Sequence, residues 1–169
     1  MLSGPVGPAV VITTGGHPAA YDVLVGLHVL CAVIGFGAVA VSGAYGAIGR
    51  HASADGARPQ AASEVRRYFA SPSSLEYLLL LAPVLGVAAM SVRPGGSEFG
   101  QIWVVAGLFI WVVAGGLLTA VVRPAERRIR GAGEDLGSVT DDARRLMWAA
   151  GASDALFVLA LILMVTQPR

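Results

Sequence analysis

The chain of 169 residues has no lysine, one cysteine and few charged residues of either sign. The single cysteine, Cys31, excludes an intrachain disulfide and any metal site built from cysteines alone. Charged residues make up 14% of the chain and the net charge is +1. A protein that binds nucleic acid needs a dense field of positive charge, so this composition argues against nucleic acid as a partner.

Apolar residues are abundant instead. Hydrophobic residues make up 55% of the chain, and the mean hydropathy of +0.68 lies outside the range of ordinary soluble domains. Four stretches approach or exceed the roughly 20 helical residues that a bilayer requires. Backbone amides in lipid must be paired within their own segment, so each stretch is expected to be a helix. The predicted fold is an all-α integral membrane four-helix bundle. It comprises residues 21–169, with spans at about 21–48, 73–92, 101–122 and 146–166.

The arginines predict the orientation of this bundle. They concentrate in the loop between the first and second spans and in the loop between the third and fourth. Short loops rich in arginine stay in the cytoplasm. We therefore predict a multi-pass protein of the bacterial inner membrane with both chain termini outside. Residues 1–20 carry prolines and a Gly15-Gly16 pair and lack a basic leader, which predicts a loosely ordered, retained extracytoplasmic tail.

Local signals refine the boundaries of the spans. Ser73 and Glu76 fit a capping box at the start of the second span, which accounts for Glu76 as a helix-capping residue. Pro83 lies inside this span and predicts a kink. The segment 61–69 has two interpretations, a short amphipathic helix on the membrane surface or a solvated connector.

Polar residues of the first span recur on one face of the helix. His28, Cys31 and Ser42 lie on a seam of small residues at heptad spacing, which indicates a face directed toward another helix. Two interpretations of His28 stay open. It is either a metal ligand, haem ligand or proton carrier, or it donates an interhelical hydrogen bond.

The ligand interpretation of His28 draws on residues expected at the same membrane depth. Met90, Met164 and His17 are predicted to lie in or beside the outer half of the bilayer, and Cys31 follows His28 by three residues on the same helical face. Imidazole and thioether ligands suit haem b or copper. These residues therefore form the candidate cofactor set, with His28 and Cys31 as the candidate metal ligands.

Asp154 is the one carboxylate expected well inside the fourth span, beside Ser153. A charge there is costly, so we expect the side chain to face the bundle, either protonated or paired. Its candidate roles are a proton relay, a counterion for an arginine, or a neutral hydrogen-bonding acid. The first of these would make the protein a small proton-coupled transporter.

Small residues support the leading functional prediction. Glycines allow helices in membranes to approach closely. The candidate packing positions are Gly35, Gly43, Gly46, Gly115 and Gly116. No hydrolase motif and no phosphate-binding loop is present. The sequence thus favours a protein without enzymatic activity that acts by helix packing, as a homo-oligomer or as an accessory subunit of a larger membrane complex.

The segment Leu27-His28-Val29-Leu30-Cys31-Ala32-Val33-Ile34-Gly35-Phe36-Gly37 resembles the opening helix of small bacterial four-span membrane proteins. With the stretch that begins at Arg123-Pro124, the chain is most similar to a predicted integral membrane family of unknown function. Copper-resistance D proteins and HemJ-type protoporphyrinogen oxidases are more distantly similar, and this similarity implies a metal or haem role for His28. The chain lacks the lysine of the HemJ-type family and has Gly35 where a tryptophan is usual.

Overall fold

The computed structural model describes residues 19–55, 59–71, 74–93, 99–132 and 140–166, without the side chains of 52–55 and 59. Over these ranges the chain forms helices and no strand, so the predicted all-α class is confirmed there. The helices are α1 (Ala19–Asp55), α2 (Pro59–Ala70), the 3-10 turn η1 (Leu75–Tyr77), α3 (Leu78–Ser91), α4 (Ile102–Leu117), the π-helical turn η2 (Leu118–Val122), α5 (Arg123–Gly131) and α6 (Thr140–Thr166).

Three helical segments are long and apolar enough to cross a membrane: Ala19–His51, Ile102–Gly131 and Thr140–Thr166. Helices α2 and α3 meet the same criteria only when counted together, as Gln60–Ala70 and Leu75–Ser91 with a 59° bend between them. The described part of the chain therefore has three candidate spans, or four if the bent pair is one span. The segment predicted as either a surface helix or a connector is α2, a helix.

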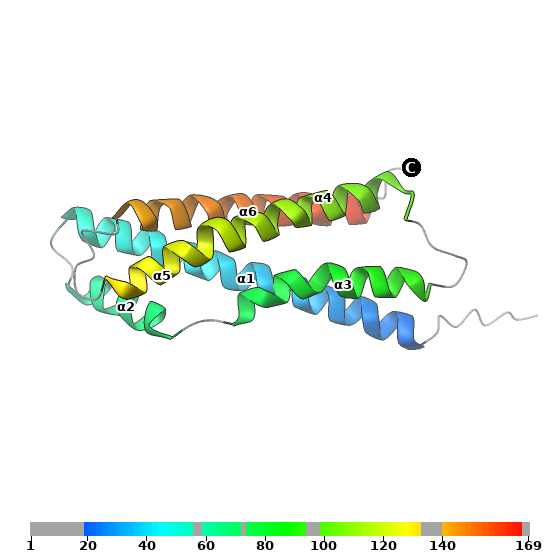
Figure 1. Ribbon diagram of the computed structural model, residues 1–169, viewed down its shortest axis with the longest axis horizontal. Coiled ribbons are helices and arrows are strands. Elements are labelled where there is room, and N and C mark those ends of the chain that lie inside the picture. Colours follow the sequence, from blue (N-terminus) through cyan, green and yellow to red (C-terminus); the bar gives the residue numbers. More distant parts are fainter. Residues whose placement is uncertain (1–18, 56–58, 72–73, 94–98, 133–139, 167–169) are drawn as a thin grey trace, which may run out of the picture.

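Helix α1 extends through the length of the bundle, between α3 and α6 (Figure 1). Two glycines allow these contacts to be close. A Cβ atom added at Gly35 would lie 2.8 Å from the Leu79 Cα atom of α3, and one added at Gly43 would collide with the Ala150 side chain of α6. These two glycines therefore let α3 and α6 approach α1 closely.

The helix of the third span continues beyond the predicted end at Val122. It passes through η2 and α5 to Gly131, where the sequence indicated a loop. Two observations explain the extension. Pro124 lies in the first turn of α5, directly after the π turn, and the fixed φ of proline is compatible with a helix. The apolar side chains of Ala125 and Ile129 are buried in the core.

Most of the described arginines lie at one end of the bundle. The C-terminal part of α1, α2, α5 and the start of α6 lie together there (Figure 1). We call this end, defined by the arginines of these helices, the arginine-rich end. The arginines are Arg50, Arg66, Arg67, Arg127, Arg128, Arg130, Arg144 and Arg145. Arg128 Nη1 donates to Asp142 Oδ1 at 2.7 Å, which ties α5 to α6.

A proline in α3 creates a contact with α4. Pro83 has no N–H, so the carbonyl of Leu79 lacks its usual partner within the helix. The indole Nε1 of Trp111 donates to this carbonyl oxygen at 3.0 Å. The interhelical bond thus satisfies a backbone group that the sequence of α3 would otherwise leave open.

Candidate functional site

The buried charges of the molecule meet where α2 bends into α3. Glu76 of η1 is fully buried, and its Oε1 accepts a hydrogen bond from Ser42 Oγ at 3.0 Å. Its other carboxylate oxygen, Oε2, lies 3.6 Å from Arg123 Nε. The Nη1 atom of Arg123 lies 3.7 Å from Glu126 Oε2, and Glu126 is 3% exposed. Together with Tyr68, these residues form what we call the polar cluster: Ser42, Tyr68, Glu76, Arg123 and Glu126.

The π-helical turn η2 stands directly before two members of this cluster. A π turn inserts an extra residue and rotates the segment that follows it. Thr119 within η2 donates its hydroxyl to the carbonyl of Gly115 at 2.8 Å, a contact that bends helices. Arg123 and Glu126 follow at i and i+3 and share one face of α5. That face is directed at Glu76.

Aromatic rings surround the polar cluster. Tyr68 Oη lies 3.0 Å from Ser42 Oγ, and the Tyr68 ring stacks on Tyr45 with centroids 4.1 Å apart. The Arg123 guanidinium lies over the ring of Tyr77, 4.1 Å from its centroid. A cation over an aromatic face gains electrostatic stabilisation, most of all where water is excluded. The rings therefore hold both the hydroxyl pair and the guanidinium in place.

The charges of the cluster are unequal in number. Two carboxyl groups, Glu76 and Glu126, contact one guanidinium, and the two carboxyl groups also interact with each other. Glu76 Oε2 is buried and accepts no hydrogen bond from the described residues. A buried charge requires a partner because its loss of hydration is expensive. The cluster thus has one carboxyl group more than the Arg123 guanidinium can neutralise.

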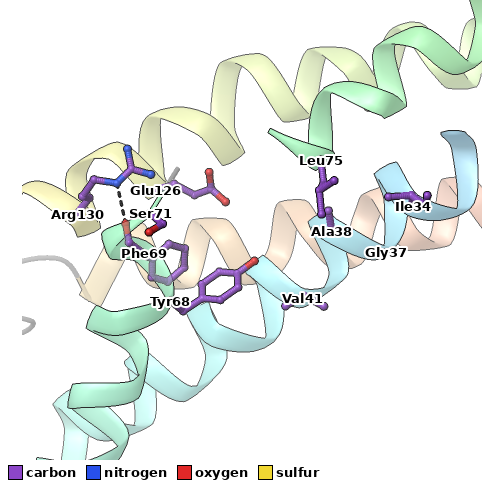
Figure 2. A pocket seen from close by; sticks show the side chains of 10 residues that line it. All are labelled: Ile34, Gly37, Ala38, Val41, Tyr68, Phe69, Ser71, Leu75, Glu126 and Arg130. Atoms are coloured by element: carbon purple, nitrogen blue, oxygen red, sulfur yellow. Dashed lines mark hydrogen bonds between the residues drawn. The ribbon is translucent and has the colours of Figure 1, made fainter. Parts of the chain in front are cut away.

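A pocket of about 420 Å³ adjoins the cluster, between α1, the end of α2, η1 and α5. One end is polar, with Arg130, Glu126, Ser71 and Tyr68, and the other is apolar, with Leu75, Ala38, Gly37 and Ile34 (Figure 2). Glu126 belongs to both the cluster and the pocket wall. Arg130 Nε donates to the carbonyl of Phe69 at 2.7 Å and so pairs one of the open carbonyls at the end of α2.

His28 lies far from this cluster along α1. Its Nδ1 atom donates to the carbonyl of Ala82 at 2.6 Å, and its ring packs against Gly86 of α3. The imidazole therefore makes the interhelical hydrogen bond that was one of its two interpretations. The ligand interpretation stays a prediction, as does the metal role of Cys31, which is buried.

The other candidate cofactor residues lie apart in the sequence and differ in exposure. His17 lies outside the described residues. Met90 is partly buried near the end of α3, and Met164 is exposed near the end of α6. Among the described residues, no group of three or more histidines, cysteines and acids is arranged to hold a metal ion. This set therefore remains a hypothesis from sequence.

Ser153 and Asp154 project in different directions from α6. Ser153 is fully buried, and its hydroxyl has no hydrogen-bond partner among the described residues. Asp154 is partly exposed and makes no hydrogen bond or ion pair within the described part of the chain. Ser153 therefore faces the bundle core, and the predicted roles of Asp154 stay predictions.

The predicted packing glycines divide into two groups. Gly35, Gly43, Gly46 and Gly115 each have a neighbouring helix within contact distance of an added Cβ atom. Gly116 has no atom within 4 Å of that position, so it packs against no described residue of this chain.

Four cluster members, Tyr68, Glu76, Arg123 and Glu126, were missed as site residues by sequence reasoning. Glu76 was attributed to a capping box, but its carboxylate contacts Ser42 and Arg123, and Ser73 lies outside the described residues. Arg123 and Glu126 were assigned to a loop. The available signal was the pair of apolar residues Ala125 and Ile129, whose i, i+4 spacing continues the helix and places one face of the segment in the core.

The apolar helices define a multi-pass integral membrane protein. Residues 22–168 match the family described as predicted integral membrane protein (DUF2269), and the chain belongs to this family. The match confirms the resemblance to an integral membrane family of unknown function and places the protein in a lipid bilayer. No curated protein and no solved structure matches the chain.

Proposed function

We propose that this membrane protein binds an amphiphilic molecule in the pocket beside the polar cluster, without catalysing a reaction. One observation carries the proposal: a single cavity has charged side chains at one end and aliphatic side chains at the other. Ligand sites combine an apolar wall with a few polar groups that fix orientation. A molecule with a polar head and an apolar tail matches both ends.

The depth of the cluster supports this proposal. At 1.5 Å per residue, Ser42 lies about 35 Å along α1 from Ala19, and Arg123 lies about 32 Å from the start of α4 at Ile102. The hydrocarbon core of a bilayer is about 30 Å thick. The cluster therefore falls near the boundary between hydrocarbon and headgroups, the depth at which a lipid carries its own polar group.

We further propose that the arginine-rich end faces the cytoplasm of a bacterial cell, so that the pocket serves the inner leaflet. The positive-inside rule supports this orientation. The test is cysteine labelling of intact cells in a Cys31→Ala background. Gln60→Cys and Ala132→Cys should resist an impermeant maleimide until the cells are opened. Labelling from outside at either position would contradict the orientation.

The binding proposal is tested by filling the pocket. Gly37 and Gly26 both belong to α1, and neither has an atom of another described residue within 4 Å of an added Cβ, apart from its own helix. Only Gly37 lines the pocket. Native mass spectrometry of protein released from nanodiscs should find one retained amphiphile per chain in the wild type and in Gly26→Trp. Gly37→Trp should lose it. Equal retention in the two variants would refute the proposal.

A second candidate function is the accessory subunit or homo-oligomer expected from the sequence. Gly107 and Gly116 of α4 favour it, because both have open space where a side chain would lie and neither is needed for packing within the described chain. Gly116→Leu should then dissociate an oligomer or co-purifying subunits, as measured by mass photometry. An unchanged mass, with no partner lost, would remove this candidate.

The haem or copper alternative has its own test. A hydrogen bond donated by Nδ1 leaves the Nε2 atom of His28 as the coordinating nitrogen. Purified protein with a Soret band that disappears in His28→Ala would establish haem, and equimolar copper in colourless protein would establish the metal. For the proton-coupled alternative, uptake that depends on a pH gradient and fails in Asp154→Asn would be required.

A further inference from the structure

The polar end of the pocket has side chains of opposite sign one helical turn apart. Glu126 and Arg130 belong to α5 at i and i+4, so they share a face, and both line the cavity. We propose, on the basis of the proposed amphiphile-binding function, that the ligand is a zwitterionic phospholipid with a primary amine, of the phosphatidylethanolamine type. Its amine contacts Glu126 and its phosphate contacts Arg130.

The carboxylate side of the pocket requires a donor that carries positive charge. Glu126 Oε2 and Arg123 Nη1 are 3.7 Å apart, farther than a hydrogen bond. The interacting Glu76 and Glu126 carboxyl groups share this one guanidinium. A primary ammonium group has three N–H donors and adds positive charge beside two carboxyl groups that contact one guanidinium. This charge complementarity selects an amine over a neutral sugar or glycerol headgroup.

The guanidinium of Arg130 is preorganised within the pocket. Arg130 uses its Nε–H to bond the carbonyl of Phe69, which fixes the plane of the guanidinium. An arginine has further donors on its two Nη atoms, and their fork geometry fits two oxygens of a phosphate. In Figure 2 the guanidinium of Arg130 and the carboxyl group of Glu126 lie at the same end of the cavity.

An anionic phospholipid fits the pocket less well. It would satisfy Arg130 but place a second negative group near Glu126 and Glu76, which already exceed their guanidinium partner in number. The exposed arginines of the arginine-rich end attract anionic headgroups by charge alone, and that attraction falls with salt. Binding inside the pocket should therefore differ from surface binding in both headgroup preference and salt dependence.

The apolar end accommodates the acyl chain. Leu75 is 53% exposed and Val41 is 46% exposed, and both line the cavity. Exposed aliphatic side chains at this depth face lipid, so the cavity opens sideways toward the bilayer. A headgroup held at Glu126 and Arg130 can thus keep its tails in the membrane.

The experiment is a lipid competition in nanodiscs, read by native mass spectrometry at high salt. With equal amounts of phosphatidylethanolamine, phosphatidylcholine and phosphatidylglycerol, the wild type should retain the first about tenfold over each of the others. The N-methylated headgroup of phosphatidylcholine keeps the charge but has no N–H to donate. Glu126→Gln is close in shape and should abolish the preference for the amine, and Arg130→Gln should weaken retention of all three lipids.

The outcomes separate this inference from the proposed function. If Gly37→Trp abolishes retention but the wild type shows no headgroup preference, the inference fails and amphiphile binding stands. If Gly37→Trp retains lipid, both fail. Soluble glycerophosphoethanolamine should not displace the lipid, because it lacks tails; displacement at equal concentration would show that the ligand is a soluble zwitterion. Arg130→Lys, which keeps the charge, should recover part of the retention lost in Arg130→Gln.

Discussion

Two polar regions of α1 are built differently: His28 faces α3, whereas Ser42 faces α2 and η1. At His28 an imidazole donates one hydrogen bond to the Ala82 carbonyl against the small surface of Gly86. At Ser42, two heptads later on the predicted seam, the hydroxyl joins a cluster with buried charges of both signs beside a cavity. The first arrangement pairs its polar group with a backbone carbonyl inside the bundle. The second has an excess carboxyl group and adjoining space, which is why we propose a binding function there.

The largest expected effect comes from removing the positive charge of the cluster. Arg123→Met leaves Glu76 and Glu126 buried without a cation, which should lower the free energy of unfolding by about 3–5 kcal/mol. The measurement is reversible denaturation in mixed micelles. Arg127→Met, an exposed position on the same helix, is the control and should be nearly neutral. Equal stability of the two variants would contradict the charge network.

The same logic predicts a rescue. Replacing Glu76 and Glu126 by glutamine removes the charges that Arg123→Met leaves unpaired, so the triple variant should recover much of the lost stability. A triple variant less stable than Arg123→Met would mean that the carboxyl groups stabilise the bundle independently of Arg123.

An intermediate effect is expected at Gly35, which lies between the two regions. In Gly35→Val the new side chain collides with the backbone of Leu79, and overpacking of this kind costs about 1–3 kcal/mol. The backbone amides of Ala82 and Glu76 should both lose protection against hydrogen exchange. Gly26→Val is the control: its side chain enters open space, so this variant measures only the effect of replacing glycine by valine in a helix. Protection unchanged in Gly35→Val would show that α1 and α3 are not in backbone contact.

A smaller effect is expected at His28. His28→Phe removes one hydrogen bond, worth about 1 kcal/mol, and keeps a ring against Gly86. Stability should fall slightly while lipid retention stays unchanged. Loss of bound lipid in this variant would indicate that the lipid binds near His28 and not in the pocket.

The smallest effect tests the bond that follows from Pro83. Trp111→Phe should cost up to about 1 kcal/mol because the Leu79 carbonyl loses its donor. In a Pro83→Ala background the helix supplies its own N–H, so the same substitution should cost less. A double-mutant cycle measures this difference. A coupling free energy of zero would show that Trp111 does not compensate for the proline.

The sequence was sufficient to predict an all-helical membrane protein because hydropathy, helix length and backbone pairing act locally. Composition alone predicts helices in lipid, and glycines such as Gly35 and Gly43 are recognisable packing positions. The helix that continues from Leu117 to Gly131 was not predicted, because six charged or proline residues follow Val122 within eight positions and the helix depends on the burial of Ala125 and Ile129.

The polar cluster was only partly predictable. Ser42 lies on the predicted seam of α1, but its partners come from three other segments that tertiary packing brings together. Glu76 satisfied a local motif, which concealed the contact with Arg123 on a distant helix. Ion pairs between segments 47 residues apart leave no local pattern in a single sequence, so the bend and the π turn had to be seen in the structure.

The most direct test of the account is site-specific photocrosslinking in native membranes. Benzoylphenylalanine placed at Val41 lines the pocket, whereas at Val105 it lies on the exposed face of α4. After extraction and extensive washing with detergent, the Val41 variant should carry covalently attached phospholipid with an amine headgroup, and the Val105 variant should carry little lipid of mixed composition. Crosslinked lipid of equal amount and equal composition at both positions would show that no amphiphile is held between α1 and α5.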